Sequence, residues 1–395
     1  MEDFIHLHVH SQYSLLDGQA SIQKMVEKAI GNGMRGMALT DHGNMFGVKD
    51  FFDCCNSVNK GRKKEGLEPF KPIFGCEVYV ARRKKEQMSD PNIDRSGNHL
   101  ILLAKNQNGY RNLIKLVSRA WVDGFYHKPR TDHDDLVRFH EDIICCSACI
   151  AGEVPSKILK GDLEGARKSA QWFKDVFGED YYLELQRHEV KDPNVAANRE
   201  TFPLQQISNA GLIKIARELN IKLICTNDSH FVNEEDADAH ERLLCLSTGK
   251  KISEPHMLYT KQEWFKTKEE MNELFSDIPE AISNTVEILD KVETYNLESD
   301  PIMPFFPIPE DFGTEEQWRQ KYTKEDLFRE FTSDENGENP LPKEEGEKKI
   351  KKLGGYDKLY RIKFEADYLG KLAYEGARRI YGEPLDKDVD DRIRF

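Results

Sequence analysis

The chain of 395 residues lacks several features, and each absence excludes a class of protein. It has no run of about 18 apolar residues, so we expect no transmembrane helix. Its first residues, Met-Glu-Asp-Phe-Ile-His, have no basic start and no apolar core, so we expect no secretory signal. It also has no surplus of basic charge, because 57 Lys+Arg against 70 Asp+Glu give a net charge of −13. A surface that coats DNA through its phosphates needs the opposite sign, so only local basic clusters remain possible.

Common signatures of catalysis are also missing. The sequence contains no phosphate-binding loop of the form Gly-x-x-x-x-Gly-Lys-Ser/Thr and no Gly-x-Ser-x-Gly elbow. Eight cysteines without an export signal indicate reduced thiols and a cytoplasmic protein, not a disulfide framework. A content of 21 Phe, 14 Tyr and 4 Trp excludes wholesale disorder, so we expect a folded α/β protein.

The first 235 residues alternate between short apolar runs and amphipathic helical stretches. Strands that alternate with helices predict a parallel sheet covered by helices. Seven such strands favour a distorted (β/α)7 barrel of the TIM type, although an open, doubly wound sheet has the same pattern. The predicted strands are residues 4–10, 36–40, 71–81, 99–105, 142–150, 181–186 and 222–226.

The pattern changes after the last predicted strand. Residues 262–298 are helical in pattern, and prolines at 301, 304, 307 and 309 predict a stiff, extended linker. A charged segment and a long helix over 356–381 follow, and the chain stops within charged sequence, as expected for a piece of a longer protein. We therefore predict a barrel domain, a helical extension with the linker, and a mostly helical third part, at 1–270, 271–312 and 313–395.

Histidines at a spacing of two mark the first predicted strand. Residues two apart in a strand point to the same face, so His6, His8 and His10 lie side by side. A bound metal explains such a row because neutral imidazole is a common ligand for Zn, Mn and Fe. An exposed polar strand face is the alternative for this triplet taken alone.

Ligand-competent side chains occur at the ends of nearly every other predicted strand. Strand ends converge on one edge of a parallel α/β fold, so these side chains are expected to meet. Mixed nitrogen, oxygen and sulfur ligands suit Zn, Mn or Fe better than Ca or Mg, and their number predicts a multinuclear site. Besides His8 and His10, the candidates are Asp17, His42, Glu77, His99, Cys149, Asp228 and His230.

The motifs that carry these residues resemble a known family. They are HLHVHSQYSLLDG at 6–18, ALTDHGNMFG at 38–47, KPIFGCEVYV at 71–80, NHLILLAKNQNGYRNL at 98–113, GFYHKPRTD at 124–132, CCSACIAGE at 145–153 and CTNDSHFV at 225–232. Together they resemble the PHP (polymerase and histidinol phosphatase) domain, in the form found at the amino-terminal end of bacterial DNA polymerase III alpha subunits. The helical segment at 366–382 is similar to the stretch that leads into the polymerase palm. The resemblance therefore implies that residues 313–395 are the start of the palm region.

The resemblance implies three metals at the nine positions. One would be held by His8, His10, Glu77 and Asp228. A second would share Glu77 and add His99 and Cys149. The third would take Asp17, His42 and His230. Two neighbouring cations clamp a phosphodiester and activate a water, so no protein nucleophile is needed.

The implied reaction is phosphate ester hydrolysis, most plausibly 3′→5′ removal of nucleotides. Glu77, Asp228 and His10 would be central to it, and Asp41 would orient a ligand imidazole or else cap a turn. Lys128, Arg130 and His188 are candidate contacts to a substrate phosphate, with surface or structural roles as the alternative.

The resemblance also implies properties of a longer parent protein. That protein would be a replicative, DNA-directed DNA polymerase that uses Mg²⁺ and binds DNA, a separate proofreading subunit and a sliding clamp. For the barrel itself, the main alternative to a nuclease is a metal-stabilised scaffold without catalytic activity. A small-molecule phosphatase is the third possible function.

Overall fold

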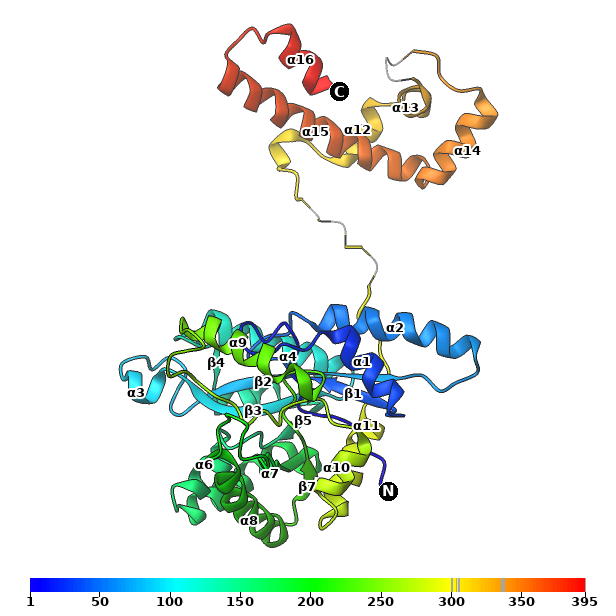
Figure 1. Ribbon diagram of the computed structural model, residues 1–395. Helices are drawn as coiled ribbons and strands as arrows, with labels where there is room; N and C mark the ends of the chain where they lie inside the picture. The colour runs from blue at the N-terminus through cyan, green and yellow to red at the C-terminus, as the bar shows by residue number, and fades with distance from the viewer. Residues whose placement is uncertain (300, 303, 305, 335–337, 395) are drawn as a thin grey trace. The chain divides into compact units, whose positions relative to one another are not determined.

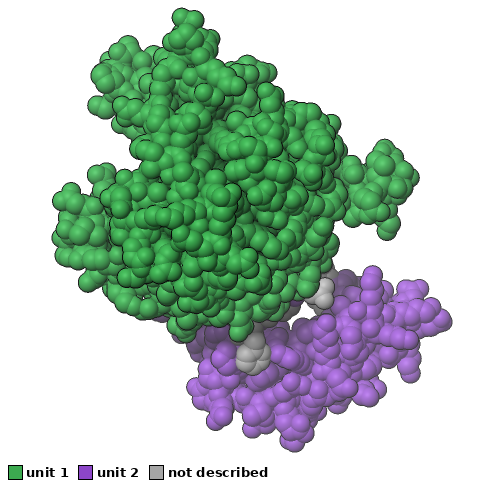
Figure 2. Space-filling model, turned by 90° about the horizontal axis from the view of Figure 1, so that it is seen from below, with its two compact units in different colours: residues 1–299 green, residues 300–395 purple. Residues whose placement is uncertain are grey.

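The computed structural model describes residues 1–395 except 300, 303, 305, 335–337 and 395. It consists of two compact units, residues 1–299 and 300–395 (Figure 2). Across the described residues, no helix is both long and apolar enough to span a bilayer. The three-part division at 270 and 312 remains a prediction, and helices α10 (Lys268–Leu274) and α11 (Pro279–Lys291) pack within the first unit.

A seven-stranded sheet with the main order β1-β2-β3-β5-β6-β7 forms the centre of the first unit (Figure 1). The short strand β4 pairs with the carboxyl-terminal part of β2, whose first residues pair with β1. Most strand residues of the sheet are fully buried, which explains their near-continuous apolar sequences. The strands are β1 (Gly36–Leu39), β2 (Lys71–Ala81), β3 (Gly97–Ala104), β4 (Arg130–Thr131), β5 (Ile143–Cys146), β6 (Tyr181–Leu185) and β7 (Lys222–Cys225).

The sheet is mixed, which corrects the prediction of a parallel one. Strand β3 runs antiparallel to both of its neighbours, β2 and β5, whereas the β1–β2, β2–β4, β5–β6 and β6–β7 pairs are parallel. The segment between β2 and β3 contains only the one-turn helix α3 (Pro91–Asp94), too little for the helical crossover that parallel neighbours need.

The first histidine segment closes the sheet into a distorted barrel. Ala38 N donates to His6 O (2.8 Å) and Thr40 N to Val9 O (2.9 Å), which joins residues 4–10 to β1. On the other side, His10 N donates to Ser229 O (2.8 Å), just beyond β7. Only the Val9–Ser229 bridge has ladder geometry, so the predicted strand over 4–10 is an irregular extended segment with partners on both sides.

Helices cover the sheet where amphipathic periodicity predicts them. The predicted helices at 163–177 and 279–292 correspond to α7 and α11, and α11 places Ile282, Ile288 and Leu289 in the core. The remaining helices of the first unit are α1 (Ile22–Gly31), α2 (Val48–Lys64), α4 (Gln107–Val122), α5 (His133–Phe139), α6 (Glu153–Leu159), α7 (Leu163–Phe177), α8 (Thr201–Leu219) and α9 (Ala237–Thr248), with short 3-10 turns at Gly178–Asp180 and Glu234–Asp236.

The second unit is helical and has a small core of its own around Leu327, Ile350 and Leu359. The described residues from 301 to 309 form neither helix nor strand, as expected where prolines recur. The predicted helix at 356–381 is α15. The elements are a 3-10 turn (Glu310–Phe312), α12 (Glu315–Lys321), α13 (Lys324–Thr332), α14 (Lys343–Leu353), α15 (Tyr356–Tyr381) and α16 (Lys387–Arg394).

Candidate metal centre

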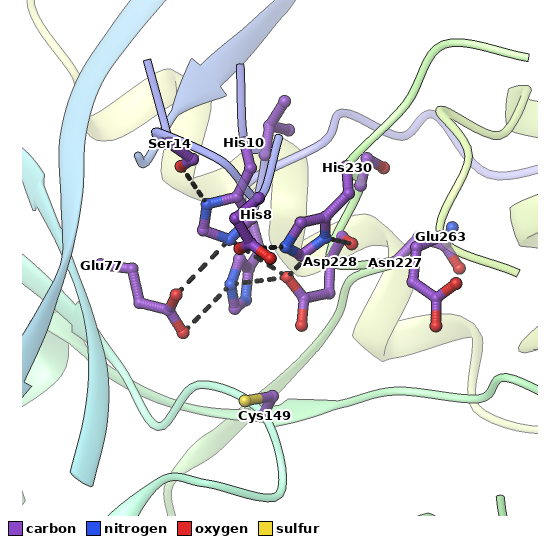
Figure 3. A network of polar contacts seen from close by, with 12 residues as sticks. His8, His10, Ser14, Glu77, Cys149, Asn227, Asp228, His230 and Glu263 are labelled. Atoms are coloured by element: carbon purple, nitrogen blue, oxygen red, sulfur yellow. Dashed lines mark hydrogen bonds and ion pairs between the residues drawn. The ribbon is translucent and has the colours of Figure 1, made fainter. Parts of the chain in front are cut away.

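The nine predicted ligands come together at one edge of the barrel. Figure 3 shows His8, His10, Glu77, Cys149, Asp228 and His230 among them. His42 and Cys149 follow β1 and β5, while Asp228 and His230 follow β7. His99 stands near the start of β3, not at its end. Because β3 runs antiparallel to its neighbours, its beginning lies at the edge where the other strands finish.

Two imidazoles and two carboxylates form the first cluster of the centre. The Nε2 atom of His8 lies 3.0 Å from Asp228 Oδ1 and 3.3 Å from Glu77 Oε1. The Nε2 atom of His10 lies 3.2 Å from the same Asp228 oxygen and 3.4 Å from Glu77 Oε2. The structure thus brings together the four residues predicted to hold the first metal.

Glu77 also contacts the set predicted to hold the second metal. His99 Nδ1 lies 2.8 Å from Glu77 Oε1, and the Cys149 sulfur lies 3.7 Å from the same nitrogen. The Nδ1 atom of His42 contacts the other oxygen of Glu77. Glu77 therefore lies among all three sets, at the middle of the centre.

Asp17 joins the two imidazoles of the third set. Its Oδ2 atom lies 2.8 Å from His42 Nε2 and 3.1 Å from His230 Nε2. Nitrogen atoms of His10, His42 and His230 all lie within 4.8 Å of one another. The third set is thus continuous with the first.

Unsatisfied atoms show that this donor set fits metal ions. Buried polar atoms are normally hydrogen-bonded, and exceptions call for a partner outside the protein. Imidazole nitrogen, carboxylate oxygen and thiol sulfur are together the donors that Zn, Mn and Fe accept. The buried atoms of the centre that make no regular hydrogen bond to described residues are His8 Nε2, His10 Nε2, His42 Nδ1, Glu77 Oε2 and Asp228 Oδ1.

The electrostatics of the centre follow from this crowding. Burial disfavours a charge on Glu77, but His99, His42 and His8 outweigh it and hold the carboxyl pKa well below its usual range. Burial likewise opposes a proton on His42, yet Glu77 and Asp17 raise its pKa to about 10. Burial and the nearby rings of His42 and His230 lower the pKa of His10 to about 3. Cations entering the centre would therefore displace protons.

The backbone at Asp228 adopts a conformation that L-residues rarely adopt. Its φ of 48° lies in the left-handed region, at a cost of order 1 kcal/mol or more. The preceding side chain holds the turn, since Asn227 Nδ2 donates to Gln262 O (2.9 Å) and Trp264 O (2.7 Å). The structure thus maintains strain at the residue whose carboxylate meets both His8 and His10.

Sequence reasoning missed a buried carboxylate behind His8. Glu184 of β6 lies 2.7 Å from His8 Nδ1, and the same oxygen accepts from Thr226 Oγ1 (2.5 Å) and Gln186 Nε2 (3.1 Å). A carboxylate in this place fixes the tautomer and orientation of a ligand imidazole and raises its basicity. The available signal was an acidic residue inside the apolar run YYLEL.

We expect Glu184→Gln to weaken metal binding by about tenfold or more while leaving the ligands in place. The amide keeps the shape and one acceptor but removes the charge that supports His8. Competition between the metal-stripped protein and a chelating dye for Zn²⁺ measures the change. Glu287→Gln is the matched control, because Glu287 accepts from Tyr182 away from the ligands. Equal affinity in the two variants would contradict this role for Glu184.

Asp41 does not contact a ligand imidazole. It accepts from Ser11 N (2.7 Å) and Ser14 Oγ (3.2 Å), so the turn-capping interpretation describes its direct contacts. Ser14 Oγ in turn lies 2.9 Å from His10 Nδ1. Any orienting effect of Asp41 on a ligand therefore passes through Ser14.

The three predicted phosphate contacts have different environments. The Lys128 ammonium is exposed and lies 5.3 Å from the ring centre of Tyr79, so its prediction stands untested. His188 is buried, and its two nitrogens contact Gln205 Nε2 (3.1 Å) and Asn227 O (3.1 Å). Both nitrogens of His188 are thus occupied behind the Asp228 turn, which corrects the prediction that it reaches a phosphate.

Arg130 is a structural residue, which corrects a second prediction. Its side chain is fully buried, and the guanidinium donates to the backbone carbonyls of Gly124 (3.1 Å) and Asp94 (2.9 Å). It also donates to Gln87 O (3.2 Å) and Lys85 O (2.5 Å). These contacts tie the β2–β3 connection to β4 and leave the guanidinium inaccessible to a substrate.

We expect Arg130→Met to destabilise the protein by about 3 kcal/mol or more, because buried carbonyls left unpaired cost roughly 1–3 kcal/mol each. Urea unfolding measures the loss. Arg138→Met on the exposed side of α5 is the control and is expected to change stability by at most about 0.5 kcal/mol. Similar midpoints for the two variants would contradict the structural role.

Comparisons with known proteins identify relatives of this chain. Residues 6–188 match the family model of the PHP domain. The chain is 45% identical over 336 residues to the DNA polymerase III subunit alpha of Borreliella burgdorferi, covering 84% of the chain and 27% of that protein. It is 38% identical over 331 residues to the Treponema pallidum subunit, covering 83% and 26%. A histidinol phosphate phosphatase structure from Lactococcus lactis, solved with zinc, aligns at 14% identity over 67% of this chain and all of its own, with a TM-score of 0.31.

The chain spans about a quarter of the length of these curated relatives. The similarity to them extends well past the PHP match, over more than four fifths of the chain. Residues 6–188 are therefore a PHP domain, and the chain is homologous to the amino-terminal region of bacterial DNA polymerase III alpha subunits.

Proposed function

We propose that the metal centre hydrolyses phosphodiesters, as a 3′→5′ exonuclease that holds up to three Zn, Mn or Fe ions. Bound cations of this kind polarise a phosphodiester and lower the pKa of a water. The side chains of the protein hold the cations and orient the ligand imidazoles. Glu77 lies among all three sets, and Asp228 joins the rings of His8 and His10.

The observation that carries this proposal is the uneven burial of the ligands. Structural metal sites are closed, whereas catalytic sites keep a side open to substrate. The His8, His10 and Glu77 side chains are at most 1% exposed. The His42, Asp17, Asp228 and His99 side chains are 16 to 20% exposed, all from the same centre. The buried ligands would hold cations, and the partly exposed ligands leave one side of the centre accessible to a phosphodiester.

A metal-stabilised scaffold that supports a polymerase and docks a separate proofreading subunit is the second candidate. The fully buried half of the centre favours it, since ligands without access to solvent serve stability. The two candidates differ in what the exposed ligands do. Loss of a partly exposed ligand such as Asp17 would abolish hydrolysis under the first candidate. Under the second it would lower only the metal content and the stability, because there is no hydrolysis to lose.

We further propose that the chain is the amino-terminal part of the catalytic alpha subunit of a cytoplasmic replicative polymerase. The full-length protein would use Mg²⁺ and would bind DNA, a sliding clamp and a proofreading subunit. The homology over more than four fifths of this chain supports this assignment. We expect no templated primer extension from these 395 residues alone, and detectable extension would contradict that expectation.

The test of the exonuclease proposal uses a single-stranded oligonucleotide labelled at its 5′ end. With Mn²⁺ or Zn²⁺ we expect a ladder of products that shorten stepwise from the 3′ end and disappear with chelator. Asp17→Asn should retain the first metal set and lose most of the activity. Intact substrate with metal-loaded protein would overturn the catalytic proposal and favour the scaffold. Activity that survives in Asp17→Asn would indicate a contaminating nuclease.

A further inference from the structure

Three aromatic side chains of the first unit stand out because they are exposed. Phe46, Trp121 and Phe125 are 56%, 41% and 47% accessible, and they are the only Phe, Trp or Tyr residues above about a third among the described residues of that unit. They form a continuous row. The Phe46 and Trp121 ring centres lie 6.2 Å apart, and Trp121 stacks on Phe125 at 5.4 Å with planes 20° apart.

The row is attached directly to the metal centre. Trp121 Nε1 donates to the carbonyl of Gly43 (2.8 Å), the residue after the candidate ligand His42. The loop after α4 packs on the same turn, because a Cβ at Gly43 would lie 2.8 Å from Pro129. Gly43 also has φ of 62°, so the close approach of loop and turn depends on glycine there.

A cation and a further ring connect the row to the ligands. The Lys128 ammonium lies 5.3 Å from the Tyr79 ring centre. That ring stacks against His42 at 5.9 Å and meets His99 edge-on at 5.2 Å. One positive charge therefore lies beside a ring that contacts two candidate ligands.

We propose that Phe46, Trp121 and Phe125 form a stacking platform for the bases of a single-stranded nucleic acid whose phosphodiester lies at the metal centre. This inference rests on the proposed hydrolysis and names where its substrate is held. Bases stack on exposed aromatic rings whatever their identity, which suits an enzyme that must accept every nucleotide.

The charge of the chain favours this mode of binding over a phosphate track. A net charge of −13 gives the chain no overall basic surplus to follow a nucleic-acid backbone, so only local basic clusters could contact phosphates. Ring stacking gains affinity without an extended basic groove, and Lys128 can contact one phosphate beside the rings. A small phosphate monoester would occupy only the metal centre and would not use the exposed rings of Phe46, Trp121 and Phe125.

The test measures the affinity of holoprotein for a fluorescent oligo(dT) strand of about 12 nucleotides, within the usual footprint of such sites. Phosphorothioate linkages slow its hydrolysis, so binding is read separately from cleavage by anisotropy. We expect Phe46→Ala and Phe125→Ala each to weaken binding by about tenfold. Neither phenylalanine side chain makes a polar contact, so both substitutions should leave the metal centre intact. The metal content per chain of each variant checks this. Trp121→Phe, which keeps a ring but loses the bond to Gly43, should retain most of the affinity.

Two controls decide the interpretation. Ile207→Ala on α8 removes an equally exposed apolar side chain (55%) elsewhere and should bind as the parent does. A strand of the same length without bases should bind parent and variants equally weakly. Unchanged affinity in Phe46→Ala and Phe125→Ala, or tight binding of the abasic strand, would overturn the platform whatever the cleavage result. Self-association of the parent chain that these variants abolish would overturn it too and identify a protein interface. Base-dependent binding without cleavage by the parent would instead contradict the proposed hydrolysis alone.

Discussion

Glu77→Gln is expected to lower the metal content by about two ions per chain. Any phosphodiester hydrolysis should fall by more than about 100-fold, which exceeds the loss of activity expected when only a residue that hydrogen-bonds to a ligand is changed. Glu77 belongs to two of the predicted metal sets and contacts His8, His10 and His99 within them, so its loss affects both sets at once. The remaining set around Asp17 retains its own carboxylate. Elemental mass spectrometry of the protein purified without a histidine tag measures the ions.

A matched buried carboxylate separates this effect from general destabilisation. Glu263 is also buried, and its carboxylate accepts from Thr260 N (3.0 Å), while its contact with the candidate ligand His230 is made by the backbone carbonyl (2.8 Å), which the substitution leaves in place. Glu263→Gln should keep the full metal content. Parent-like metal content in Glu77→Gln would show that Glu77 is not a ligand and would remove the basis for a multinuclear centre.

Removing the metals is expected to lower the melting temperature of the first unit by about 8 °C for each ion held at 1,000 times its Kd. Each such ion stabilises the native state by about 4 kcal/mol, and a domain of this size gains about 2 °C per kcal/mol. Stripped of cations, the centre also buries imidazoles and carboxylates whose atoms lack regular partners. Calorimetry before and after chelation, with the metal restored in a third run, measures the shift.

The Glu77→Gln variant provides the control for chelation, because it should start with fewer ions and lose less. A chelator that acted on the protein by any other route would shift both proteins equally. Identical melting of parent and stripped protein would contradict tight binding at all three sets. This measurement does not depend on whether the centre is catalytic, so it also applies to the scaffold.

Much of the fold could be predicted from hydrophobic pattern, but strand direction could not. Six of the seven predicted strands are present, since short apolar runs between amphipathic helices identify buried strands. A hydrophobic pattern does not indicate in which direction a strand runs, so the antiparallel orientation of β3 could not be predicted from the sequence. Strand β4 has two residues, Arg130 and Thr131, which is too short to leave a pattern. The segment at 4–10 alternates like a strand but bonds too irregularly to form a ladder.

The site was predictable where residue type and strand ends coincide. All nine candidate ligands lie in one cluster, and His42, His99, Cys149, Asp228 and His230 lie near strand ends that meet at this edge. The residues behind the ligands were not predictable in the same way. Glu184 resembles any polar residue in a strand, and a buried arginine such as Arg130 has the same sequence signature as one that binds phosphate. Only the partners in the folded chain distinguish them.

The closure of the barrel by residues 4–10 has a consequence for how the protein is made. Half of that segment's backbone bonds go to residues beyond β7, so His8 and His10 meet Asp228 only after residue 230 has left the ribosome. At about 5–20 residues per second, the first histidines wait roughly 10–45 s for their partners. The metal centre is therefore among the last features of the barrel to assemble during translation. An amino-terminal fragment that ends before β7 would emerge with its histidines unpaired and exposed to whatever metal the cell supplies.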